Sequence, residues 1–215
     1  MRAVAKDVCA NLQPPYLLPY VRAAERHGAD FPSLLWASPH TQATRFDAIQ
    51  RLGDLNRRSV LDVGCGRADL LTFLLERGVR PADYTGIEAV DDLAAAAERN
   101  CAAHSAPPAR IIRADFVREP LRLFAGADVV VISGALNTVE DGPFYTTIRR
   151  AFEAGAESLV FNFLCSSYLA GAEYLRWRRA GDVLPYCHQL TDAVRTLDDY
   201  LEGDFTVALF KHRGT

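Results

Sequence analysis

Two carboxylates flank a glycine-rich turn in the first third of the chain. Asp62 ends an apolar run that begins at Val60, Gly64 and Gly66 follow it, and Asp69 opens a helical pattern. Glycines allow a backbone to pass close to a ligand. The two acids would repel phosphates, whereas they would attract a ligand that carries an ammonium or a sulfonium group. The turn therefore predicts a nucleotide-type site for a positively charged ligand.

Further acids follow the next two predicted strands. Glu88 ends a strand about 20 residues beyond the glycine turn, where an acid accepts hydrogen bonds from ribose hydroxyls. Asp115 and Phe116 follow another strand, where an acid can meet the edge of an adenine and a ring can cover its face. The plainer alternatives are an acid at a helix entrance for Glu88, and a loop acid with a core aromatic for the pair. Their common position after successive strands favours the nucleotide interpretation.

Strands and helices must alternate to position these residues. Apolar runs predict strands at 59–63, 84–88, 110–113, 127–133, 158–164, 193–200 and 204–212. Two short helices are predicted within residues 1–37, and longer ones follow at 39–53, 68–77, 91–104, 143–153 and 182–190. Ser38, Gly78 and either Asp91 or Asp92 are the expected helix caps. A tight turn at 201–203 predicts that the last two strands form an antiparallel hairpin.

This alternation predicts an α/β fold: a Rossmann-like, doubly wound, mostly parallel seven-stranded sheet, with helices on both faces and a C-terminal antiparallel hairpin. Residues 1–40 are expected to form a helical cap segment, and residues 41–215 the ligand-binding domain. Ligands of such sheets bind at the carboxyl ends of the strands.

Composition narrows the class of protein. The 215 residues are 49% hydrophobic and 24% charged, and the net charge is −3, which is typical of a globular α/β protein and argues against an extended nucleic-acid surface. The five cysteines are scattered and odd in number, which predicts free thiols in a reducing, cytoplasmic compartment. We expect no membrane span, because there is no apolar run of 18 residues. We also expect no metal, because Cys187 and His188 are adjacent and the other histidines are scattered.

Four successive motifs, VLDVGCGRADL, YTGIEAV, IIRADF and ADVVVISGALN, resemble those of class I S-adenosylmethionine-dependent methyltransferases. The resemblance covers roughly residues 40–212, and DAVRTLDDYLEGDFTVALFKH is similar to the final hairpin of that family. It implies S-adenosylmethionine as cofactor and S-adenosylhomocysteine as product. The implied cofactor-binding residues are Arg45, Asp62, Gly64, Cys65, Gly66, Asp69, Glu88, Ala89, Asp115, Phe116, Ser133 and Gly134.

Within this implied set, Asp62, Gly64 and Gly66 face the methionine end of the cofactor, and Arg45 reaches its carboxylate. Glu88 holds the ribose, Asp115 and Phe116 meet the adenine, and Ser133 and Gly134 line the pocket floor near the methyl group. One departure is Ala68, which stands where the family often has a third glycine and is expected to change the turn slightly.

Other chemistries fit less well. A dinucleotide-dependent oxidoreductase needs a third glycine where this chain has Asp69, and a carboxylate there would oppose a pyrophosphate. Cys65 could be taken for a nucleophile, but a small residue packed under the turn is the favoured interpretation. The sequence Ser133-Gly134-Ala135-Leu136-Asn137 lacks the [DN]-P-P-[YF] signature of adenine methylation in DNA.

The favoured function is methyl transfer to a small-molecule acceptor. Tyr16, Tyr20, Phe31 and Trp36 of the N-terminal segment would cap the pocket, and residues 168–184 would form a second wall. One alternative is an RNA- or protein-directed methyltransferase that docks through residues 176–179, and another is a non-catalytic S-adenosylmethionine-binding module. The candidates for a catalytic base, by position alone, are Asn137, Asp141, Tyr145, Asn162 and Tyr168. The acceptor, the base and the oligomeric state are left open.

Overall fold

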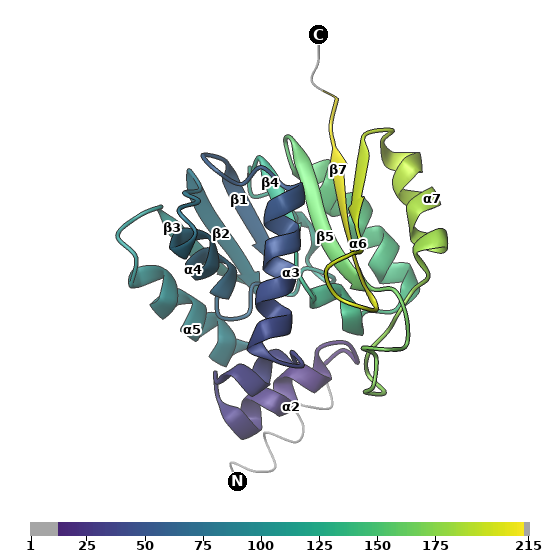
Figure 1. Cartoon of the computed structure of the whole chain (residues 1–215). Helices are drawn as coiled ribbons and strands as arrows, with labels where there is room; N and C mark the ends of the chain where they lie inside the picture. Colours follow the sequence, from purple (N-terminus) through teal and green to yellow (C-terminus); the bar gives the residue numbers. More distant parts are fainter. Residues whose placement is uncertain (1–12, 213–215) are drawn as a thin grey trace.

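A seven-stranded sheet forms the centre of the protein (Figure 1). The computed structural model describes residues 13–212. The strands are β1 (Ser59–Val63), β2 (Asp83–Glu88), β3 (Ala109–Arg113), β4 (Val129–Ile132), β5 (Ser158–Leu164), β6 (Val194–Leu197) and β7 (Asp204–Phe210). They lie in the order β3-β2-β1-β4-β5-β7-β6. The first five are parallel, and β7 runs antiparallel to β5 and β6. The predicted fold class is confirmed.

Helices cover both faces of this sheet. They are α2 (Leu18–His27), α3 (Pro39–Leu52), α4 (Asp69–Glu76), α5 (Asp91–Ala102), α6 (Asp141–Ala154) and α7 (Ala180–Leu190), with 3₁₀ turns η1 (Phe31–Leu34), η2 (Pro120–Leu123) and η3 (Ala135–Thr138). Apolar residues of β4 alternate between the faces. Val129 and Val131 pack with α3 and α4, whereas Val130 and Ile132 pack with α6 and α7. Such a strand is buried on both sides, as its unbroken apolar run predicted.

Most of the predicted helix ends are confirmed. Ser38 caps α3, because its Oγ accepts the Thr41 backbone N–H at 3.1 Å. Gly78 follows α4 with φ 76°, the left-handed conformation that ends a helix. The predicted cap of α5 was wrong: Val90 occupies the cap position and Asp91 lies in the first turn. The backbone N–H of Val90 already donates to Glu88, which is the acid that organises this helix start.

The hairpin differs from its predicted form. Strand β6 ends at Leu197 instead of residue 200, so residues 198–203 form a longer loop than the expected three-residue turn. Tyr200 explains the difference, because its hydroxyl lies 2.6 Å from Thr206 Oγ1 and folds the loop back onto β7.

The segment before α3 covers one end of the sheet. Figure 1 shows α2 lying across the end toward which β1 and β2 run. Leu34 of η1 packs with Val90 and Leu93 at the start of α5, and Trp36 packs against this cluster. The cap is therefore anchored to the domain beside the glycine turn. No helix among residues 13–212 is long and apolar enough to cross a membrane.

Candidate active site

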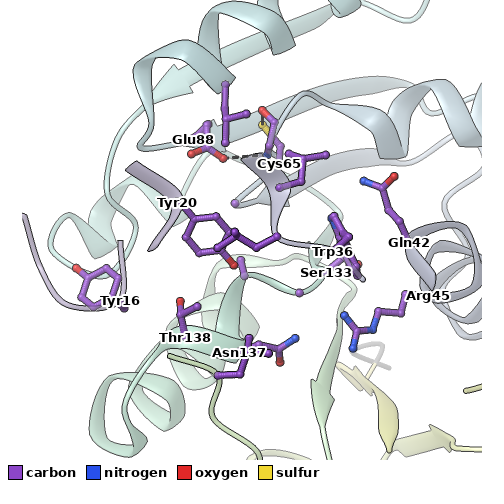
Figure 2. A pocket seen from close by; sticks show the side chains of 18 of the residues that line it. Tyr16, Tyr20, Trp36, Gln42, Arg45, Cys65, Glu88, Ser133, Asn137 and Thr138 are labelled. Carbon is purple, nitrogen blue, oxygen red and sulfur yellow. Dashed lines mark hydrogen bonds between the residues drawn. The ribbon is translucent and has the colours of Figure 1, made fainter. Parts of the chain in front are cut away.

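A cavity lies where the parallel strands end, beneath α2 and η1 (Figure 2). The structure gathers most of the predicted cofactor residues in its wall, namely Arg45, Asp62, Gly64, Cys65, Gly66, Glu88, Ala89, Phe116, Ser133 and Gly134. Asp69 and Asp115 are not part of the lining. The strand order brings residues from five separate motifs together at one edge.

The turn after β1 adopts a backbone that glycine suits. Gly64 and Gly66 have φ of 70° and 58°. A Cβ on Gly64 would lie 2.4 Å from the Cβ of Ala135, and a Cβ on Gly66 would lie 2.7 Å from Leu34 Cδ2. Ala68, at the position of the absent third glycine, takes the left-handed conformation itself, with φ of 60°. The turn thus keeps its shape with alanine in that place.

Glu88 joins the end of β2 to the glycine turn. Its Oε2 accepts the Gly66 backbone N–H at 2.9 Å, and its Oε1 accepts the N–H groups of Ala89 and Val90 at 2.9 and 2.8 Å. Burial raises the pKa of this carboxyl to about 7, against the opposing effect of these three hydrogen bonds. The carboxylate is held in one orientation at the cavity wall, and one lone pair of Oε2 is left for a ligand hydroxyl.

Asp62 is the second acid of the wall. It is 3% exposed, and Tyr84 donates its hydroxyl to Asp62 Oδ2 at 2.6 Å. Burial, together with the negative charge of Asp69, raises the pKa of Asp62 to about 7, against the opposing effect of the hydrogen bond from Tyr84. Asp69 itself faces away from the cavity lining, where it pairs with Arg67 at 3.1 Å and accepts a hydrogen bond from Gln42. Asp62 and Glu88 are therefore the two acids of the cavity lining.

Asp115 connects the cap to the loop after β3. Its Oδ2 accepts the hydroxyl of Tyr16 at 2.7 Å, and its Oδ1 accepts the Val117 backbone N–H at 3.0 Å. The neighbouring Phe116 is buried and lines the cavity. The acid predicted at the adenine edge thus fastens the cap over that side of the cavity.

Cys65 has a packing position. It is 8% exposed, and its sulfur occupies the space that a Cβ on Gly86 would need, 2.6 Å away. Burial and the nearby carboxylates of Asp62 and Glu88 raise the pKa of the thiol well above its usual range. A protonated, packed thiol is a poor nucleophile. Within residues 13–212, no cluster of His, Cys, Asp and Glu is suited to hold a metal ion.

Comparisons with known proteins agree with this geometry. A family model described as a methyltransferase domain matches residues 60–155, from β1 to the end of α6. A search of curated proteins finds no match.

Solved structures share the fold at low sequence identity. The magnesium protoporphyrin IX methyltransferase from Synechocystis PCC 6803, with bound S-adenosylmethionine, has a TM-score of 0.61, 14% identity and 80% coverage of each chain. The methyltransferase domain of bacterial CtHen1 has a TM-score of 0.61 and 14% identity, over 80% of this chain and 99% of that chain. An O-methyltransferase family protein from Burkholderia thailandensis has a TM-score of 0.64 and 15% identity, over 79% and 56%. Residues 60–155 thus match a methyltransferase-domain family model, and the fold of the chain is the one that these methyltransferases share.

The cavity wall fits S-adenosylmethionine, the molecule bound in the Synechocystis structure. Glu88 presents a fixed carboxylate that suits a ribose diol, and Asp62 adds negative charge near the glycine turn. Phe116 presents an aromatic surface on the same side as Glu88. When bound, the cofactor supplies an electrophilic methyl group on a positively charged sulfur.

The rest of the cavity lining is largely apolar. It comes from the cap, the end of β5 and the segment after β5, and includes Leu17, Tyr20, Leu35, Trp36, Leu164, Leu169 and Leu175. Phe31, which was predicted to cap the pocket with Tyr16, Tyr20 and Trp36, is absent from the described lining. Thr41 and Gln42 also line the cavity, although the sequence analysis did not predict them. Gln42 could have been found, because it lies three residues before Arg45 and shares its helix face.

The candidate bases separate into two groups. Asn137 lines the cavity, and its Oδ1 accepts the Leu164 backbone N–H at 3.2 Å. Asn162 is fully buried below the floor, where it accepts the Gly134 N–H at 2.9 Å and donates to Ser133 Oγ at 3.3 Å. The remaining candidates, Asp141, Tyr145 and Tyr168, are not among the lining residues.

Arg45 is a buried cation in the wall. It is 7% exposed, its Nε donates to Asp204 at the start of β7, and its guanidinium lies 4.9 Å from the centre of the Trp36 ring. Burial lowers the pKa of Arg45 to about 10, so it stays charged at neutral pH.

The basic segment 176–179 is engaged in internal contacts. Arg176 pairs with Glu140 at 3.0 Å. Arg178 is buried, donates to Asp141 at 2.9 Å and to the Val139 carbonyl at 2.5 Å. These bonds fasten the segment after β5 to the start of α6, so that it forms the second wall.

Proposed function

We propose that this methyltransferase transfers a methyl group from S-adenosylmethionine to a small molecule bound beneath the cap. The supporting observation is that a single cavity combines the cofactor residues with an apolar wall. Its wall extends from Gly64 and Glu88, at the ends of β1 and β2, to Leu169 and Leu175 after β5. The cavity therefore borders both the proposed cofactor site and an apolar region that suits an acceptor of modest size.

The chemistry places simple demands on the protein. The lone pair of the acceptor atom forms a bond to the methyl carbon while the carbon–sulfur bond breaks, and the electron pair stays on sulfur as a neutral thioether. The chain supplies alignment and a dry site. Glu88 and the glycine turn fix the cofactor, Trp36 stands beside Gly134 at the floor, and Leu169 and Leu175 exclude water from the acceptor side.

A nucleic-acid or protein acceptor is less well supported. Two of the arginines predicted to form a docking surface, Arg176 and Arg178, are committed to Glu140 and Asp141. Trp177 and Arg179 stay exposed. An RNA-directed enzyme predicts binding that weakens steeply as salt rises. A non-catalytic module predicts cofactor binding without space for an acceptor, which the apolar half of the cavity opposes.

The test begins with calorimetric titration of S-adenosylhomocysteine into wild type and Glu88→Ala. We expect the variant to bind at least tenfold more weakly, because it loses the carboxylate that meets the ribose. Glu98→Ala is the matched control, since Glu98 lies on the surface of α5 and pairs with Arg113. Equal affinities of wild type and Glu88→Ala would contradict the proposed cofactor site.

Methyl transfer is then tested by release of S-adenosylhomocysteine during incubation with pools of small molecules, and separately with total RNA and with denatured protein. We expect turnover with a small-molecule pool. Turnover with RNA or protein alone would replace this proposal by the macromolecular alternative.

A further inference from the structure

The cavity has two charged ends that are separated by most of the sheet. Glu88 is the last residue of β2. Arg45 is hydrogen-bonded to Asp204, which is the first residue of β7. Strands β1, β4 and β5 lie between β2 and β7. Four strand spacings of about 4.8 Å place the ends of these two strands roughly 19 Å apart. Figure 2 shows Glu88 and Arg45 on opposite sides of the pocket.

The cofactor is too short to occupy both ends. About eight bonds of ~1.5 Å separate a ribose hydroxyl of S-adenosylmethionine from its carboxyl carbon, which gives an extended span of about 10 Å. With its ribose on Glu88, the methionine end would lie near the glycine turn and Gly134. Trp36 stands between that position and Arg45. A Cβ on Gly134 would lie 2.9 Å from the Trp36 ring, and the Arg45 guanidinium lies over the same ring. Arg45 therefore lies beyond the cofactor.

Arg45 is arranged to bind an anion. Its Nε donates to Asp204, and its two terminal nitrogens have no hydrogen-bond partner among residues 13–212. Figure 2 shows the guanidinium projecting from α3 toward the cavity, on the side of Asn137. A guanidinium edge with two free N–H groups matches the geometry of a carboxylate. The pairing with Asp204 fixes the direction in which this edge points.

The residues around Arg45 indicate the chemical character of the rest of the ligand. Asn137 uses its Oδ1 for the Leu164 backbone N–H, which leaves its amide N–H groups to donate into the cavity. Leu164, Leu169 and Leu175 provide an apolar wall beside these donors. We propose that the methyl acceptor is a small apolar molecule with an acidic group, and that Arg45 binds this acidic group as the specificity-determining contact.

This inference rests on the proposed function and adds the class of acceptor. It assigns Arg45 to the acceptor instead of to the cofactor carboxylate that the sequence resemblance implied. An acidic group at this end turns the other end of the acceptor toward the methyl group, so Arg45 acts as a positioning residue. An anion is also attracted by the sulfonium of the cofactor, which favours binding after the cofactor.

The first test uses the wild-type protein saturated with S-adenosylhomocysteine. Calorimetry compares 3-phenylpropionate and 4-phenylbutyrate with the corresponding neutral amides, which have nearly the same size. We expect each acid to bind at least tenfold more tightly than its amide. Equal binding of acid and amide, or no binding of either acid at millimolar concentration, would overturn the inference.

The second test removes the cation. In Arg45→Met we expect the preference for acids to disappear while the affinity for S-adenosylhomocysteine stays within twofold of wild type. Because this change leaves Asp204 unpaired, the double variant Arg45→Met with Asp204→Asn repeats the measurement without a buried lone charge. A tenfold loss of S-adenosylhomocysteine affinity in the double variant would assign Arg45 to the cofactor and overturn the inference. Failure of wild type to bind S-adenosylhomocysteine would instead contradict the proposed function.

Discussion

The backbone N–H of Gly66 donates to the carboxylate of Glu88 at 2.9 Å, so the turn after β1 is tied to the end of β2. This bond aligns the two motifs that surround the proposed ribose site. It also holds a carboxyl in a buried position, where its ionised form is disfavoured. The same relationship that shapes the site therefore makes the site sensitive to pH.

We predict that S-adenosylhomocysteine binds more tightly as pH rises from 6 to 8. Burial raises the pKa of Glu88 and of Asp62 to about 7, and ribose hydroxyls and a ligand cation both favour the ionised carboxylates. If the bound state is fully ionised, each group contributes about a tenfold gain over this range. Calorimetry in buffers of different ionisation enthalpy should report proton release on binding.

Glu88→Gln provides the control for this prediction, because it keeps the size of the side chain and removes one titration. We expect it to retain about half of the logarithmic pH dependence. The ligand-free protein should show the opposite sign: both pKa values lie above those of the unfolded chain, so the stability contribution of these groups is lost as pH rises toward 7. A pH-independent affinity in wild type would contradict the assignment of both acids.

A second prediction compares two glycines. Gly64→Ala should destabilise the protein by about 2 kcal/mol or more, because φ is 70° and the new Cβ would lie 2.4 Å from Ala135 Cβ. Gly142→Ala, in the first turn of α6 with open space around it, should be neutral or stabilising by up to about 1 kcal/mol. Urea unfolding followed by circular dichroism measures both. Similar effects of the two changes would show that the turn tolerates a side chain.

The sequence predicted the parts of the fold that local patterns encode. The strand at Val129–Ile132 was recognisable because an apolar run without alternation is typical of a strand covered on both faces. The cap of α3 was predictable because Ser38 precedes Pro39, and proline is favoured at the first position of a helix. The cavity wall was largely predictable for a related reason: each of its motifs directly follows a strand, and parallel strands end at one edge.

Long-range partners were not predictable in this way. Asp115 accepts a hydrogen bond from Tyr16, 99 residues away, and Arg178 binds Asp141, 37 residues away. Nothing in the local pattern distinguishes these side chains from solvated ones. The same holds for Arg45 and Asp204, which meet because α3 packs against β7. The partners of these charged residues therefore became visible only in the structure.

The basic segment 176–179 gives the third prediction. Arg178→Ala should lower the free energy of unfolding by about 2 kcal/mol, because it removes two hydrogen bonds and the stacking on Phe144 at 3.8 Å. Arg179→Ala, at an exposed position, should change it by less than about 0.5 kcal/mol. Chemical denaturation measures both values. Equal, small effects would mean that Arg178 is as dispensable for stability as a surface arginine.

The last prediction concerns the hydrogen bond between Tyr16 of the cap and Asp115 of the loop after β3. Tyr16→Phe removes the hydroxyl that donates to Asp115 at 2.7 Å, without changing the ring that lines the cavity. A hydrogen bond of this kind contributes about 0.5–1.5 kcal/mol, so S-adenosylhomocysteine should dissociate roughly 2- to 12-fold faster, because the cap opens more readily. Stopped-flow displacement measures the rate. Tyr145→Phe is the matched control, since it removes a hydroxyl outside the cavity lining and should leave the dissociation rate unchanged. If both variants release the ligand at the wild-type rate, the bond between Tyr16 and Asp115 does not control opening of the cap, and the ligand leaves by another route.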